Sequence, residues 1–127
     1  MKYLAIDYGL RYLGLAVSFD SLAEPFGQID YRREAEALEQ VAQTCREQAI
    51  GTIVVGISEG KMAQRTRGFA KRLAQSSGLP VEFEDETLTS QEAEQRLIET
   101  GKGQQKRRQK DHQVAAALIL QAFLDRQ

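Results

Sequence analysis

Short apolar runs closed by turn residues alternate with longer segments of helical periodicity along this chain. Runs rich in Leu, Ile and Val that stop at Asp or Gly are typical of strands. Apolar positions that recur every three or four residues predict helices. From these patterns we expect, in order, strands 3–6, 12–18 and 28–31, helix 33–48, strand 52–56, helix 62–75, strand 80–84, helix 89–101 and a last helix through 114–123.

This order predicts an α/β fold in which an antiparallel meander precedes βα units whose strands run parallel. Residues 28–31 form a short run in which polar and apolar residues alternate, and the run follows Pro25 and Gly27. These features favour an edge strand. Residues 52–56 are β-branched without polar alternation, which favours a central strand covered on both faces. Residues 101–109 are polar and cationic, and we expect a mobile loop there.

The 127 residues suit a single domain spanning 1–127, with enough apolar side chains for a core that needs no disulfide or structural metal. Cys45 and His112 are the only residues of their types, which excludes a disulfide framework and a Cys/His zinc site. Cys45 continues a helical apolar stripe, so we expect a buried thiol without chemistry. No apolar run approaches the roughly 20 residues of a membrane span, and we expect a cytoplasmic protein.

Charge is balanced overall, with 17 basic and 18 acidic side chains, but it is segregated along the chain. Residues 61–72 and 101–110 together hold ten of the cations and no acid. This segregation predicts a basic surface able to hold a polyanion such as nucleic acid. The alternative is that both windows are ordinary solvated faces.

Acidic residues stand at the ends of predicted core elements: Asp7 closes the first strand, Asp85 and Glu86 follow the fifth, and Asp111 opens the last helix. Helical spacing from Ala115 back to Asp111 directs this carboxylate toward the sheet. Carboxylates brought together raise each other's pKa unless a cation neutralises them. A hard divalent ion, Mg²⁺ or Mn²⁺, is the natural partner, and two such ions about 4 Å apart would support phosphodiester cleavage.

Each acid also has a structural alternative. Asp7 could be a turn residue, Asp111 could complement the helix dipole, and the acids near residues 82–86 could form the wet face of an edge strand. Strand alternation places Asp85 and Glu86 on opposite sides, so the pattern does not decide which of them would enter a site.

Four segments, in chain order, resemble the YqgF group of Holliday junction resolvases, also described as pre-16S rRNA nucleases. They are Ala5-Ile6-Asp7-Tyr8-Gly9 with Gly14-Leu15-Ala16-Val17, Ile53-Val54-Val55-Gly56, Asp85-Glu86-Thr87-Leu88-Thr89, and Asp111 with Ala115-Ala116 and Ile119-Leu120-Gln121. The resemblance implies an RNase H-like fold, with a mixed five-stranded sheet flanked by helices. It also implies that Asp7, Glu86 and Asp111 are the catalytic, metal-binding acids. Thr87 stands where the group usually has Arg, and Gly56-Ile57-Ser58 replaces Gly-Leu-Pro.

The leading hypothesis is a Mg²⁺-dependent nuclease acting on structured nucleic acid, either a Holliday junction or the 5′ end of a 16S rRNA precursor. We expect six cations to contact phosphates, namely Arg11, Arg65, Lys106, Arg107, Arg108 and Lys110. One alternative is a nucleic-acid-binding ribosome-maturation factor with little or no catalysis, which the missing Arg at Thr87 favours. Another is the phosphate loop of an actin-like or sugar-kinase ATPase, but such folds need two domains. The sequence is compatible with a monomer or a homodimer, and we expect His112 to be an ordinary helix histidine outside the site.

Overall fold

The computed structural model describes residues 1–85 and 104–127, with side chains from residue 112 onward in the second range. Three helices and five strands make up these residues. They are β1 (Tyr3–Tyr8), β2 (Tyr12–Phe19), β3 (Leu22–Asp30), α1 (Glu34–Glu47), β4 (Thr52–Ile57), α2 (Lys61–Ser77), β5 (Val81–Asp85) and α4 (Gln104–Asp125). The predicted helix 89–101 lies outside the described residues.

The strands form one mixed sheet of order β3-β2-β1-β4-β5. β1, β2 and β3 pair antiparallel as a meander, whereas β4 runs parallel to both β1 and β5. The carboxyl ends of β1, β4 and β5 therefore share one edge of the sheet. The predicted α/β class and mixed five-stranded sheet are confirmed, including the edge position of β3 and the buried interior position of β4.

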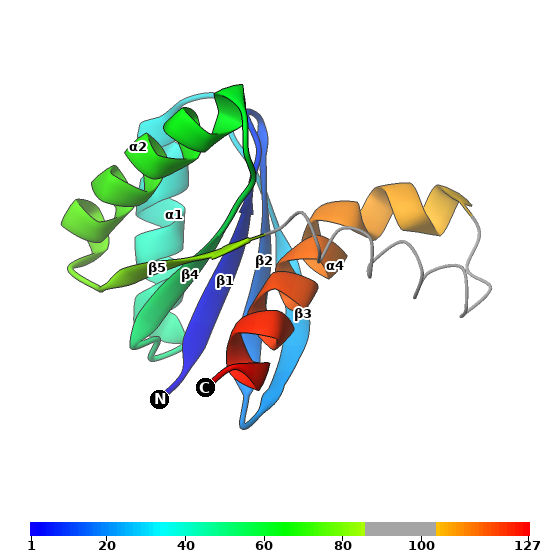
Figure 1. Ribbon diagram of the computed structural model, residues 1–127. Coiled ribbons are helices and arrows are strands. Elements are labelled where there is room, and N and C mark those ends of the chain that lie inside the picture. The colour runs from blue at the N-terminus through cyan, green and yellow to red at the C-terminus, as the bar shows by residue number, and fades with distance from the viewer. Residues whose placement is uncertain (86–103) are drawn as a thin grey trace.

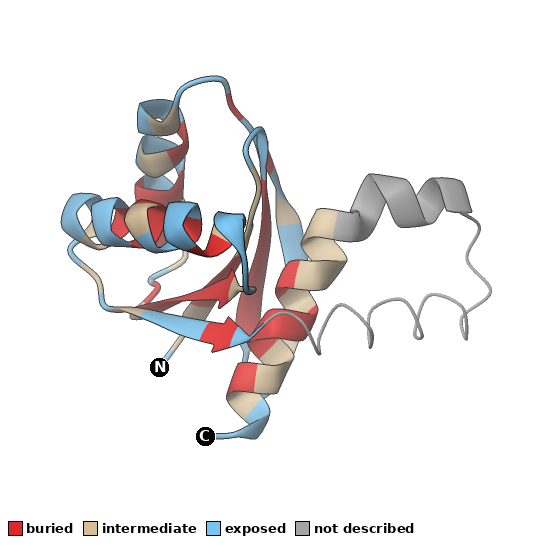
Figure 2. Cartoon of the chain, turned by 45° about the horizontal axis from the view of Figure 1, so that its top comes forward, coloured by how far each residue is buried: buried red, intermediate tan, exposed pale blue. Residues whose placement is uncertain are grey.

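Helices cover both faces of this sheet, α1 and α2 on one side and α4 on the other (Figure 1). The first face is packed by large apolar side chains, among them Leu4, Ile6 and Phe69. The second face is built from smaller residues under α4, and Figure 2 shows the buried positions of α4 turned toward the sheet. Residues 61–72 and 104–110, from the two cationic windows, thus lie on helices that cover opposite faces of the sheet.

Two features of the strands differ from the prediction or refine it. β3 begins at Leu22 and continues through Pro25 and Gly27, whereas the sequence predicted a strand only after these residues, at 28–31. A register shift of the β2–β3 ladder between Leu15 and Ala16 marks a bulge opposite this stretch. An edge strand with a bulge tolerates Pro, because its missing N–H faces away from the ladder.

The last helix is longer than the sequence suggested. α4 begins at Gln104, so residues 104–109 are helical and the prediction of a loop there is wrong. Asp111 is the eighth residue of α4 rather than its opening residue, which removes the helix-dipole explanation, since that effect is confined to the first turn. Gln121 ties the helix to the β2–β3 hairpin: its side-chain oxygen accepts the Ala23 N–H, and its amide donates to the Ser21 carbonyl, both at 3.0 Å.

Cys45 is confirmed as a buried residue of α1. Burial raises the pKa of its thiol to about 11, so the thiolate is scarce at neutral pH. Because the thiolate is the reactive form of cysteine, this residue contributes packing rather than chemistry.

Candidate functional site

Asp7 lies near the carboxyl end of β1, the middle strand of the sheet. Side chains alternate along a strand, so Asp7 shares a face with Ala5, which packs under α4. Its side chain is 18% exposed and is therefore reachable from solvent without being surrounded by it. A carboxylate in this position keeps its ligand capacity while its orientation is restricted by the sheet.

Gly14 lets α4 approach this carboxylate closely. It is the cross-strand partner of Asp7 on β2. A Cβ atom at Gly14 would lie 1.9 Å from the carbonyl oxygen of His112 and 2.2 Å from its carbonyl carbon. Such distances are far below van der Waals contact, so only glycine permits this crossing of helix and strand. The glycine thereby fixes the height at which α4 passes over the end of β1.

His112 meets Asp7 as a result of this crossing. Its Nδ1 lies 3.2 Å from the Asp7 Oδ2. Its imidazole also stacks on the Tyr12 ring, with centroids 5.7 Å apart and planes 25° apart. The expectation that His112 stands outside the site is therefore wrong. The backbone of Asp111 precedes His112 in α4 and reaches the same edge of the sheet.

The buried stripe of α4 explains why sequence spacing missed His112. The residues packed on the sheet are Ala116, Ile119, Leu120 and Phe123. One helical turn before Ala116 stands His112, whereas the sequence analysis followed a stripe through Ala115 to Asp111. The two stripes are one residue apart, about 100° around the helix.

The turn between β1 and β2 is held by Tyr31, which is buried beside it. The Tyr31 hydroxyl donates a hydrogen bond to the Gly9 carbonyl oxygen, and its backbone N–H donates to the Arg11 carbonyl at 3.0 Å. Burial, followed by repulsion from Tyr8, raises the pKa of Tyr31 to about 12. The hydroxyl thus remains a donor at physiological pH, and the turn next to Asp7 is fixed on both sides.

A Tyr31→Phe substitution tests this anchor. We expect the free energy of unfolding to fall by about 1 kcal/mol at pH 8, because one hydrogen bond is lost with little change in packing. The folded-state pKa lies above the unfolded value of 10, so the contribution of this group is complete below pH 10 and is lost as the pH rises through 12. Wild-type protein should lose up to about 2–3 kcal/mol more than the variant over this range. Denaturant titrations from pH 8 to 12 measure the difference, and a constant difference would contradict the assignment.

The last two residues of β5, Glu84 and Asp85, are acids whose side chains point to opposite faces. Glu84 is buried on the α4 side, where it forms an ion pair with Arg126. Burial raises the pKa of the Glu84 carboxyl, and the guanidinium of Arg126 opposes that rise. Glu84 is therefore a structural anchor for the end of α4, and the suggestion that it belongs to a wet strand face is wrong.

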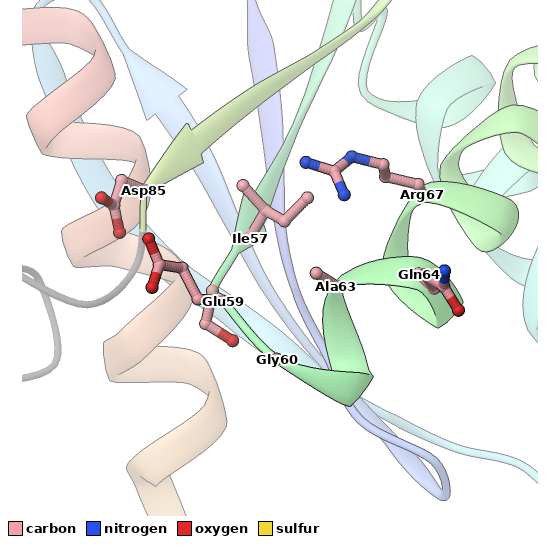
Figure 3. A pocket seen from close by; sticks show the side chains of 8 residues that line it. Ile57, Glu59, Gly60, Ala63, Gln64, Arg67 and Asp85 are labelled. Atoms are coloured by element: carbon pink, nitrogen blue, oxygen red, sulfur yellow. The ribbon is translucent and has the colours of Figure 1, made fainter.

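Asp85 lies on the other face of β5, away from Asp7. It pairs with Ile57 and lines a pocket of about 370 Å³ beside the start of α2. Figure 3 shows Asp85 at the end of β5 and Glu59 after β4, with Arg67 extending from α2. Glu84 and Asp85 thus lie on opposite faces of the sheet, and Asp85 does not face the Asp7 site.

The structure describes the other predicted site residues to different extents. Glu86 lies outside the described residues, and only the backbone of Asp111 and of the four cations at positions 106, 107, 108 and 110 is described. Arg11 is exposed in the turn beside Tyr12, whereas Arg65 is exposed on α2, across the sheet from α4. Within the part of the chain whose side chains are described, three or more His, Cys, Asp or Glu residues do not gather as a metal cluster. No helix among the described residues is long and apolar enough to cross a bilayer.

The mixed five-stranded sheet flanked by helices is the RNase H-like fold that is found in RuvC-like resolvases. RuvC from T. thermophilus, solved in complex with a Holliday junction substrate, superimposes with a TM-score of 0.68 at 18% identity, covering 99% of this chain and 95% of that one. The fowlpox virus Holliday junction resolvase gives a TM-score of 0.63 at 12% identity, with full coverage of both chains. At these identities the similarity establishes the fold.

The chain belongs to the RuvX family, described as Holliday junction resolvase, whose model matches residues 1–126. A protein of Anaeromyxobacter sp. strain Fw109-5 named "Putative pre-16S rRNA nuclease" is 41% identical, over 98% of this chain and 97% of its own length. A relative of the same name from Pelotomaculum thermopropionicum is 38% identical, over 100% of this chain and 88% of its own length. The predicted YqgF membership is confirmed, and with it a family of nucleic-acid hydrolases.

Proposed function

We propose that this chain, acting as a single domain, is a divalent-metal-dependent nuclease that cleaves phosphodiester bonds in structured nucleic acid. The observation that carries the proposal is the half-buried carboxylate of Asp7 at the edge where α4 crosses β2. We assign Asp7, Glu86 and Asp111 as the catalytic and metal-binding acids, with Mg²⁺ or Mn²⁺ as cofactor. The names of its family and relatives point to two substrates, a Holliday junction or a 16S rRNA precursor. We expect the protein to act on them in the cytoplasm.

The donor set of this site fits a hard divalent ion. Asp7 offers carboxylate oxygens that are partly exposed, and Cys45, the only cysteine of the sequence, is buried on the other face of the sheet. Carboxylate and water oxygens are what Mg²⁺ and Mn²⁺ prefer. Asp7 would hold the ion together with Glu86 and Asp111, and the bound ion would activate a water and stabilise the leaving oxygen.

Strand alternation supports Glu86 over Asp85 as the second acid. Asp85 lies on the α2 side of β5, opposite Asp7. By the alternation of side chains along a strand, the sequence predicts the opposite side, that of α4, for the residue after Asp85. His112, at 3.2 Å from Asp7, would orient that carboxylate.

Cationic side chains would supply affinity without reading sequence. Arg11 is exposed next to the site, and we expect the cations of the first turns of α4, Lys106, Arg107, Arg108 and Lys110, to contact phosphates on the same face. Arg65, on the other face, would contact a distant stretch of the same nucleic acid.

Cleavage assays with matched substrates test this function. Labelled four-way DNA junctions and precursor 16S rRNA fragments would be incubated with Mg²⁺, with Mn²⁺ and with EDTA, beside linear duplexes of the same sequences. We expect metal-dependent product from one branched or precursor substrate and none in EDTA. Salt-sensitive binding without any product would contradict the nuclease and favour a binding factor in ribosome maturation, in keeping with Thr87 at the usual Arg position.

A further inference from the structure

The Tyr12 ring lies close to the candidate site but has no role in the proposed cleavage. Tyr12 opens β2 and stacks on His112, whose Nδ1 lies 3.2 Å from Asp7. One side chain therefore separates the Tyr12 ring from the candidate catalytic carboxylate. A nucleotide bound with its phosphate at Asp7 can bring its own base, or that of its neighbour, to this ring.

Tyr12 is exposed although its neighbours on β2 are not. It keeps 40% of its surface exposed, whereas the next six residues, 13–18, are all buried. The contact with His112 orients the ring, so its remaining surface is presented at a fixed angle. Oriented exposed aromatic rings are what proteins use to stack unpaired bases.

Next to Tyr12 lies a pocket of about 380 Å³ whose lining has mixed charge. It is formed by Arg11, Tyr12, Asp30, Tyr31, Arg32 and Glu36. Two guanidiniums suit a phosphate, but two carboxylates disfavour a groove that holds phosphates alone. Carboxylates do accept hydrogen bonds from the amino groups of bases, as acids do with cytosine. The mixed charge of the pocket therefore fits a whole nucleotide, with its base, better than a phosphate backbone alone.

The placement of Asp30 supports this fit. It is the cross-strand partner of Tyr12, so the two side chains share one face of the sheet. Its Oδ1 accepts a hydrogen bond from the Gln28 amide at 2.9 Å, which orients the carboxylate. An ionised carboxylate has further acceptor sites, so Asp30 remains able to bind a base edge.

We infer that Tyr12, with this pocket, binds an unpaired nucleobase beside the phosphate that is cut. The inference rests on the proposed function, and it names the substrate class: a strand with an unstacked nucleotide at the cleavage position. Bases inside a duplex have both faces covered and their pairing edges engaged, so they cannot reach the ring. Junction crossovers, flaps and single-stranded precursor ends offer such a base.

Fluorescence of 2-aminopurine tests the inference independently of cleavage. The full chain would be titrated, in EDTA, into single-stranded DNA and RNA oligonucleotides that carry this base, and into duplexes of the same sequence. We expect the wild-type protein to bind single-stranded DNA, single-stranded RNA or both, and to quench their fluorescence. Tyr12→Ala should bind these strands with roughly 5- to 100-fold weaker affinity and without quenching. Tyr12→Phe should retain both signals.

The matched control is Phe26→Ala, because Phe26 is an equally exposed aromatic residue, at 41%, that does not line the pocket. It should bind like wild type, and Tyr12→Leu gives a second variant if Tyr12→Ala melts at a lower temperature. The inference would be overturned if wild type and Tyr12→Ala bound single strands with equal affinity. It would also be overturned if Tyr12→Ala lost as much affinity for duplexes as for single strands. If the protein cleaves its substrate but binding does not depend on Tyr12, the proposed function holds and this inference is wrong. If quenching depends on Tyr12 but no substrate is cleaved, the inference holds and the nuclease function is wrong.

Discussion

Asp7→Asn is expected to lower metal-dependent cleavage by at least about 100-fold, because the amide keeps the shape of the side chain but not its charge for a divalent ion. Folding should be little affected, since the amide can still bond with His112, which lies 3.2 Å from the present carboxylate. Nucleic-acid affinity in EDTA should also persist, because phosphate contacts are made by cations. Initial cleavage rates, thermal melting and binding isotherms measure the three quantities.

Asp85→Asn is the matched control for this substitution. It removes the same charge from a strand end at the same edge, but on the α2 side of the sheet. We expect it to cleave like wild type, whereas Glu86→Gln should behave like Asp7→Asn. Full activity of Asp7→Asn would exclude the mechanism, and loss of activity in Asp85→Asn with retention in Glu86→Gln would reverse the assignment of the second acid.

Gly14→Ala is expected to have the largest effect on stability, because the new methyl group would enter the backbone of α4 at His112, only 1.9 Å from its carbonyl oxygen. Backbone atoms cannot rotate away, so the helix must shift as a whole. We expect the free energy of unfolding to fall by about 3 kcal/mol or more. Cleavage should fall as well, since the shift moves His112 and the backbone of Asp111 away from Asp7.

Gly68→Ala provides the same substitution in a tolerant place. Gly68 lies inside α2, and its nearest neighbour would be the guanidinium end of Arg72, at 3.2 Å. A flexible side chain can move, and Ala favours a helix interior over Gly by roughly 0.5–1 kcal/mol. Denaturant unfolding should show this variant at or above wild-type stability. A Gly14→Ala protein as stable and active as Gly68→Ala would contradict the role given to the crossing.

Much of the fold could be predicted because many of its strands and helix ends are determined by local sequence. The β-branched run of β4 and the Gly78 stop after α2, where φ is 72°, follow from side-chain and backbone preferences alone. The start of α4 was missed because residues 104–110 carry no apolar stripe, although Gln, Lys and Arg are good helix formers. The high charge of these residues suggested a loop, although they form the first turns of α4.

The site was less accessible to sequence reasoning because it depends on how elements cross. Asp7 could be found from its position at a strand end, but the role of His112 depends on Gly14, which lies 98 positions away in the chain. Residue spacing gives the face of a helix only to within about one residue, and here one residue separates Asp111 from His112. Only the packing of α4 on β2 selects between them.

The contact between Asp7 and His112 spans 105 positions and joins the first strand to the last helix. A chain leaving the ribosome cannot form it until residue 112 has emerged, so this edge of the sheet is completed only after both β1 and α4 have been made. A chain that has been made only as far as β5 would therefore lack the contact of Asp7 with His112. If Asp7 acts as proposed, the order in which the elements are synthesised would delay activity until α4 has folded onto β2.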